Sequence, residues 1–84
     1  MNRKDILKEL KVILQNTLNK KDIDDVKESA DLFTDLGLDS ISILRMVISI
    51  EELLKVDFDD TSLRNFKTVK DVVDYIEGYY KKTK

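Results

Sequence analysis

The sequence contains no cysteine and no histidine. Without cysteine the chain can form neither disulfide bonds nor thiolate metal sites. Without histidine it lacks the commonest general base and the commonest zinc ligand. A cysteine nucleophile or a serine–histidine pair therefore cannot be built from this chain. We expect neither a self-sufficient enzyme nor a metal site.

Proline is also absent, and glycine occurs only at Gly37 and Gly78. So few backbone breaks favour helices. The length of 84 residues is that of one small domain, and 42% apolar with 38% charged residues is typical of a folded chain. We expect a single domain over residues 1–84 and a monomer, and Met1 with the charged ends favours a free-standing chain.

Neither sign of charge dominates, because 15 basic residues face 17 acidic ones and the net charge is −2. The chain therefore has no broad cationic surface for nucleic acid. The most apolar stretch, residues 41–50, contains Arg45 and is too short to cross a bilayer. Half of residues 1–10 are charged and they contain no apolar run, unlike a secretory signal. We expect a soluble cytoplasmic protein with no membrane span.

Apolar residues recur at helical spacing in three long segments and one short one. The spacing predicts helices at about residues 3–18, 40–55, 60–66 and 68–81. The expected N-caps are Asn2, Asp39 and Thr68, the last with Asp71 in the capping-box position. The predicted fold is all-α, a small antiparallel bundle of three main helices plus one short helix.

The segment 19–39 has no sustained helical period and is long for a connection in so small a domain. Its apolar side chains are expected to tie it to the core: Val26, Leu32, Phe33 and Leu36. Gly37 can adopt positive φ and turn the chain just before the next helix.

The predicted helix 40–55 has apolar residues on two sides. At about 100° per residue, one broad sector faces the other helices and holds Ile43, Met46, Val47, Ile50, Leu53 and Leu54. The nearly opposite side holds Ile41, Leu44 and Ile48, surrounded by charged Arg45, Glu51, Glu52 and Lys55. The short helix or the long loop could cover this second stripe, or it could be an exposed partner-binding strip with a charged border, and the two interpretations can both hold in part.

Asp39 and Ser40 stand at the start of the same helix. Such a pair is a common capping dipeptide. Ser40 has no histidine to remove its proton, so any chemistry at its hydroxyl needs another protein. A helix N-terminus would also favour an attached phosphate.

The run Leu36-Gly37-Leu38-Asp39-Ser40-Ile41, followed by an apolar helix with Glu51-Glu52-Leu53, resembles the acyl carrier protein family. The resemblance covers nearly the whole chain, including Asp57-Phe58 and the segment 72–76. It implies that Ser40 carries a covalent 4′-phosphopantetheine arm, which a phosphopantetheinyl transferase adds from coenzyme A. It also implies that Asp39 helps to position this transferase and that Ile41, Leu44 and Ile48 contact partners or the arm.

The resemblance fits the absence of cysteine, because the arm supplies the thiol that a thioester needs. Catalysis then belongs to partner enzymes, namely an acyl- or aminoacyl-loading ligase and the synthase or transferase enzymes. In the family, acyl chains can also fold back among the helices.

Two residues depart from the family's pattern. Fatty-acid carriers usually have a strongly acidic second helix, whereas Ser42 and Arg45 stand here where acids are common, and Glu51 and Glu52 remain. This departure predicts a dedicated partner with an acid facing Arg45, in a specialised fatty-acid or polyketide-type pathway. Alternatively, Arg45 only pairs with Glu52 or Ser49 along its own helix.

Two other functions stay open. An aminoacyl or peptidyl carrier loaded by an adenylating enzyme has the same architecture, although Leu38 replaces the second glycine common in peptidyl carriers. A helical adaptor that is never modified would bind its partner through Ile41, Leu44 and Ile48.

Overall fold

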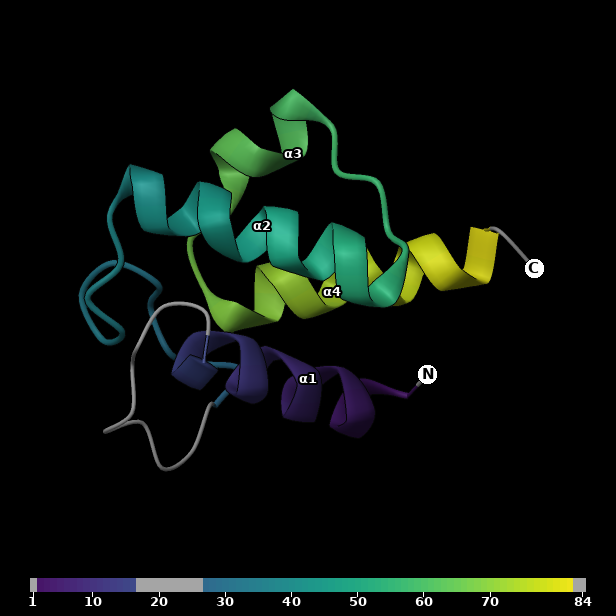
Figure 1. Ribbon diagram of the computed structural model, residues 1–84, viewed down its shortest axis with the longest axis horizontal. Helices are drawn as coiled ribbons and strands as arrows, with labels where there is room; N and C mark the ends of the chain where they lie inside the picture. Colours follow the sequence, from purple (N-terminus) through teal and green to yellow (C-terminus); the bar gives the residue numbers. More distant parts are fainter. Residues whose placement is uncertain (1, 17–26, 83–84) are drawn as a thin grey trace.

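The computed structural model describes residues 2–16 and 27–82, and this part of the chain folds into four helices (Figure 1). They are α1 (Arg3–Asn16), α2 (Ser40–Leu54), α3 (Asp60–Asn65) and α4 (Val69–Lys82). The prediction of three main helices and one short helix is confirmed, with bounds that agree to within about two residues. Residues 17 and 18 of the predicted first helix, and Val26, lie outside the described residues.

The three long helices lie roughly along one axis, and α3 lies beyond α2, away from α1 (Figure 1). α1 runs antiparallel to both α2 and α4, which share one direction because α3 and its flanking segments return the chain between them. α1 packs against both of these helices.

The predicted caps form at α1 and α4. The Asn2 side chain accepts a hydrogen bond from the Asp5 amide at 2.9 Å. Thr68 and Asp71 form a reciprocal capping box, in which the Thr68 amide donates to the Asp71 carboxylate at 3.0 Å and the Asp71 amide donates to the Thr68 hydroxyl at 3.3 Å. These side chains satisfy amide groups that have no partner inside the helix, so they stop each helix from extending towards its N-terminus.

The core is formed by all three long helices. All but one of the six α2 residues predicted to face the bundle are buried, and the core contains no buried polar side chain among the described residues. The prediction is wrong for Leu53, whose exposed fraction is 58%. Leu53 lies in the last turn of α2, at the edge of the buried sector. At about 100° per residue it falls just outside the range of directions that the buried residues of α2 occupy.

The segment 27–39 is held against the beginning of α4 by backbone hydrogen bonds. The Leu32 amide donates to the Lys67 carbonyl at 2.9 Å, and the Val69 amide donates to the Ala30 carbonyl at 3.0 Å. Leu32 is buried and Leu36 packs against the core, as predicted. Phe33 does not anchor the segment as predicted, because 44% of its side chain is exposed. A tight turn around the Asp31 carboxylate, which accepts from the amides of residues 33 and 34, directs Phe33 away from the core.

Aromatic side chains connect the segment after α2 to α4. The rings of Phe58 and Tyr75 stack with their centroids 4.8 Å apart, and Phe66 meets both rings edge-on. The Tyr75 hydroxyl donates to the Asp57 carbonyl at 2.9 Å, and the Tyr80 hydroxyl donates to the Leu54 carbonyl. These contacts place the two tyrosines at the edge of the core and hold the segments on both sides of α3 against α4.

Arg3 connects three parts of the chain. Its guanidinium pairs with Glu28 in the loop and with Asp74 and Glu77 on α4, the last two at 2.7 and 3.2 Å. Hydrogen bonds from Lys70 and Arg3 hold the pKa of Asp74 below its ordinary value. Asp74 thus stabilises the fold in its ionised form.

Because Leu32 is the buried anchor of the loop, we expect Leu32→Ala to lower the free energy of unfolding by about 2–5 kcal/mol. Phe33→Ala is the matched control, and it should change stability by less than about 1 kcal/mol because Phe33 is outside the core. Urea denaturation monitored by circular dichroism measures both. Equal losses for the two variants would contradict the assignment of Leu32 as the anchor.

The lowered pKa of Asp74 predicts how the stability of the fold changes in acid. Its stabilisation is present above the ordinary carboxyl pKa of about 4 and is lost as the pH falls through the lower folded-state pKa. We therefore expect Asp74→Asn to have a flatter dependence of unfolding free energy on pH below about pH 4. Asp57→Asn is the control of equal charge change, because it removes an exposed carboxylate that has no ion pair in the described part of the chain. An unchanged slope in Asp74→Asn would count against this assignment.

Candidate functional site

Ser40 is the first residue of α2 and is exposed. Asp39 is the N-cap, with an extended backbone, and its carboxylate accepts a hydrogen bond from the Ser42 amide at 2.8 Å. The predicted role of Asp39 as a helix cap is thus confirmed. The same hydrogen bond lowers the pKa of Asp39, so its carboxylate stays ionised beside Ser40.

The preceding residues determine where this serine sits. Leu38 is buried, and its amide donates to the Leu32 carbonyl at 3.0 Å. Gly37 has φ of 67°, a left-handed conformation that costs a residue with a Cβ about 1–2 kcal/mol. The turn at Gly37 therefore places Leu38 in the core and leaves Ser40, two residues later, at the surface.

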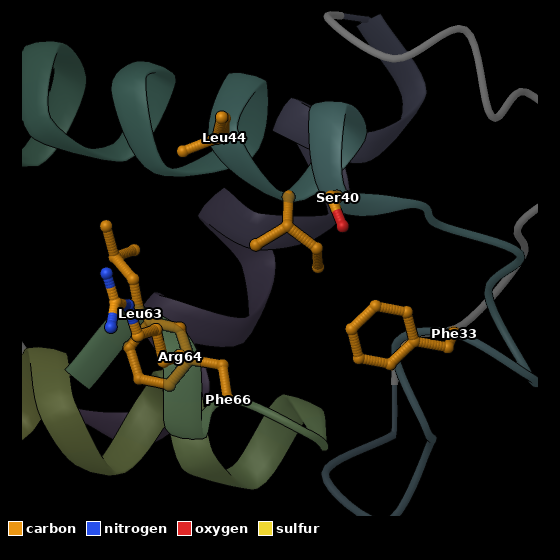
Figure 2. A pocket seen from close by; sticks show the side chains of 7 residues that line it. Phe33, Ser40, Leu44, Leu63, Arg64 and Phe66 are labelled. Carbon is orange, nitrogen blue, oxygen red and sulfur yellow. The ribbon is translucent and has the colours of Figure 1, made fainter. Parts of the chain in front are cut away.

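A pocket of about 300 Å³ opens beside Ser40. In Figure 2, Ser40 lies on α2 at the edge of the pocket, the Phe33 ring closes it from the loop, and the side chains of α3 lie opposite. Leu44, Leu63, Arg64 and Phe66 complete the labelled lining. Most of these side chains are apolar, so the pocket is suited to a hydrocarbon chain or another apolar group.

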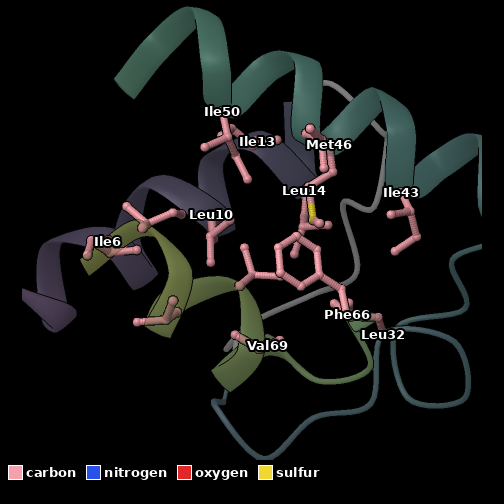
Figure 3. Close-up of a cluster of buried hydrophobic side chains, with 14 of the residues drawn as sticks. Ile6, Leu10, Ile13, Leu14, Leu32, Ile43, Met46, Ile50, Phe66 and Val69 are labelled. Atoms are coloured by element: carbon pink, nitrogen blue, oxygen red, sulfur yellow. The ribbon is translucent and has the colours of Figure 1, made fainter. Parts of the chain in front are cut away.

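The floor of the pocket is part of the core. Ile43 and Phe66 line the pocket and are also among the buried residues that α2 and the segment before α4 contribute to the core (Figure 3). The pocket therefore has a packed inner wall, whereas Phe33, Leu44 and Arg64 at its opening are exposed. An apolar occupant would extend the core outwards.

The second apolar stripe of α2 is exposed. Ile41, Leu44 and Ile48 have exposed fractions of 64%, 51% and 53%. The stripe is therefore exposed rather than covered by α3 or the loop, although Leu44 also borders the pocket, and its binding to a partner stays a prediction.

The charged residues around the stripe differ in their surroundings. Arg45 makes no ion pair with Glu52 or with any other described residue. Glu52 is exposed, whereas Glu51 is half-buried and accepts a hydrogen bond from the Phe58 amide at 3.3 Å. The alternative in which Arg45 pairs along its own helix is therefore not observed.

The sequence reasoning did not associate Phe33, Leu63, Arg64 and Phe66 with Ser40. They come from the loop, from α3 and from the segment after α3. No periodic pattern joins residues on separate elements, so spacing gives no signal for such a pocket. Only the way α3 and the loop pack beside α2 brings these side chains together.

This arrangement can display a serine but cannot activate it. Asp39, the ionised neighbour of Ser40 in the sequence, has its carboxylate engaged by the Ser42 amide. Removal of the Ser40 proton therefore needs a base from another molecule. In residues 2–16 and 27–82, no helix has the length and apolar character needed to cross a membrane.

Residues 8–76 match the family model described as "Phosphopantetheine attachment site". The chain is 40% identical over 78 residues to the acyl carrier protein of Coprothermobacter proteolyticus, covering 93% of this chain and 94% of that protein. It is 43% identical over 58 residues to the acyl carrier protein of Phytoplasma mali, covering 69% of each. The crystal structure of an acyl carrier protein from Thermotoga maritima is similar with a TM-score of 0.91 and 25% identity, covering 100% of this chain and 96% of that one.

Asp39→Ala should lower the melting temperature, because the Ser42 amide loses its acceptor. Asp39→Asn is the matched control, since its side-chain oxygen can accept the same hydrogen bond. Hydrogen exchange measured by NMR should be faster at the Ser42 amide in Asp39→Ala and nearly unchanged in Asp39→Asn. Equal protection in both variants would show that the carboxylate is not the cap.

Proposed function

The chain belongs to the acyl carrier protein family, whose members bear a phosphopantetheine attachment site, and from this premise we propose that Ser40 is the attachment residue. The chain is accordingly a carrier rather than an enzyme. When bound, the arm supplies the thiol on which an acyl group is held as a thioester. The main structural evidence for Ser40 is that its side chain is exposed at the first position of α2, at the edge of an apolar pocket.

The position of Ser40 suits a phosphodiester. The first amides of α2 and the helix dipole place partial positive charge there, which favours an attached phosphate. Since the chain has no histidine, the transferase must remove the Ser40 proton as the bond from Oγ to phosphorus forms and a diphosphate bond of coenzyme A breaks. Asp39 is proposed to help orient this enzyme, in addition to capping α2.

The pocket supports a further role in holding the cargo. Its apolar lining, with a packed inner wall of Ile43 and Phe66, offers a hydrocarbon chain a place out of water. We assign the apolar part of an acyl group to this pocket, with Leu44 and Leu63 on either side. Sheltering the chain there would lower its exposure while the carrier is between enzymes.

We propose a phosphopantetheinyl transferase, a loading ligase and synthase or transferase enzymes as the partners. Arg45 favours a specialised fatty-acid or polyketide-type pathway, because its cation is exposed where the resemblance leads one to expect an acid. The cytoplasm is the proposed location. An aminoacyl carrier is the second candidate, and loading assays with fatty acids, aryl acids and amino acids distinguish the two.

Incubation of the unmodified protein with coenzyme A and a broad-specificity phosphopantetheinyl transferase should raise its intact mass by one arm. Ser40→Ala should abolish this gain, because it removes the hydroxyl at the first position of α2. Ser42→Ala, two residues away on the same helix, should be modified like the wild type. Modification of Ser40→Ala, or none of the wild type with transferase in excess, would contradict the assignment.

The adaptor alternative makes the opposite prediction in cells. If the protein acts only by binding through Ile41, Leu44 and Ile48, Ser40→Ala should complement a deletion strain fully. A carrier whose arm is on Ser40 should lose complementation completely, and Ser42→Ala should retain it.

A further inference from the structure

Two arginines, Arg45 on α2 and Arg64 on α3, have no ion-pair partner among the described residues. Both side chains are exposed. By contrast, Arg3, Lys70 and Lys81 each have a carboxylate within 4 Å. The two guanidinium groups are therefore available for a charged partner outside the chain.

The exposed apolar stripe lies between these cations. Leu44 lines the pocket together with Arg64, which places Arg64 on the α3 side of the stripe (Figure 2). Arg45 follows Leu44 and points about 100° further around α2, so it lies on the other side of Ile41 and Ile48. The result is an apolar ridge along α2 with one cation on each flank.

No acid of α2 neutralises this end of the ridge. The helix has no acidic residue before Glu51, and the Glu51 carboxylate is directed to the Phe58 amide. Asp39 accepts from the Ser42 amide at the beginning of the helix. The helix dipole adds further positive potential at the Ser40 end.

We propose that Ile41, Leu44, Ile48, Arg45 and Arg64 form a docking surface for a protein partner whose apolar groove is bordered by carboxylates on both sides. Charge complementarity selects this occupant, because a groove bordered by Lys or Arg would bring like charges together. A flat anionic lipid surface would meet exposed Glu52 together with the ridge, whereas a protein groove can place its carboxylates beside Arg45 and Arg64 alone. The inference rests on the proposed function for the identity of the partner, an enzyme that uses the arm, but the docking itself does not need the arm.

The test uses two designed helical hairpins that share one backbone and one Leu-lined groove. The groove is bordered by Glu in one hairpin and by Lys in the other. Calorimetric titration at low ionic strength should give about fivefold tighter binding to the Glu hairpin, since two exposed ion pairs each contribute modestly. NMR shift changes on binding should map to α2 and α3.

The variant R45E/R64E should reverse the preference. K4E/K8E is the matched control, because it changes two exposed lysines of α1 and shifts the net charge by the same amount. It should keep the wild-type preference, and circular dichroism verifies that both variants are folded. Equal binding of the two hairpins, or a preference for Glu that survives in R45E/R64E, would overturn the proposal.

Two further measurements test other occupants. Tighter binding to phosphatidylglycerol vesicles than to the Glu hairpin, or a dimer that R45E/R64E abolishes in sedimentation, would overturn the proposal in favour of a lipid surface or a second copy. The hairpin titration is repeated with Ser40→Ala, which should keep the preference. If the protein gains no mass with the transferase but still prefers the Glu hairpin, only the assignment of Ser40 as the attachment residue is refuted. If it gains the mass but binds both hairpins equally, only the docking surface is refuted.

Discussion

The structure around Ser40 depends on how the segment 27–39 is held against the beginning of α4. Backbone hydrogen bonds between residues 32 and 67 and between residues 69 and 30 act like a short stretch of sheet, and Leu32 is buried beside them. A long connection in a small domain would otherwise have many conformations to lose on folding. Because this segment is fixed at Leu32 and Leu38, α2 begins at a defined place.

α2 is buried on one side and exposed as an apolar surface on the other. Its buried side contributes residues such as Met46 and Ile50 to the core, and this packing makes it a stable platform. Its outer stripe is not needed for the fold, since Ile41 and Ile48 remain more than half exposed. A carrier that supplies no catalytic group needs just such a surface, because every chemical step takes place on another protein.

Packing also explains where the sequence-based expectations failed. Leu53 was assigned to the core by its angular position, which lies at the edge of the sector that other helices cover. Phe33 was expected to tie its segment to the core as one of the apolar side chains there, but the turn around Asp31 directs it outwards to the pocket. Arg64 carried no signal at all, because its significance depends on which side of α2 the short helix α3 occupies.

The sequence by itself determined the helices, their caps and the presence of a second apolar stripe on α2, whereas its exposure was decided by the structure. These features depend on residues within a few positions of one another, so periodicity and capping side chains are sufficient to predict them. Only the tertiary structure decided the pocket beside Ser40, the ion pairs of Arg3 and the pair of arginines on either side of the stripe. Those features join residues from different elements, and their proximity follows from how the helices pack rather than from any local pattern.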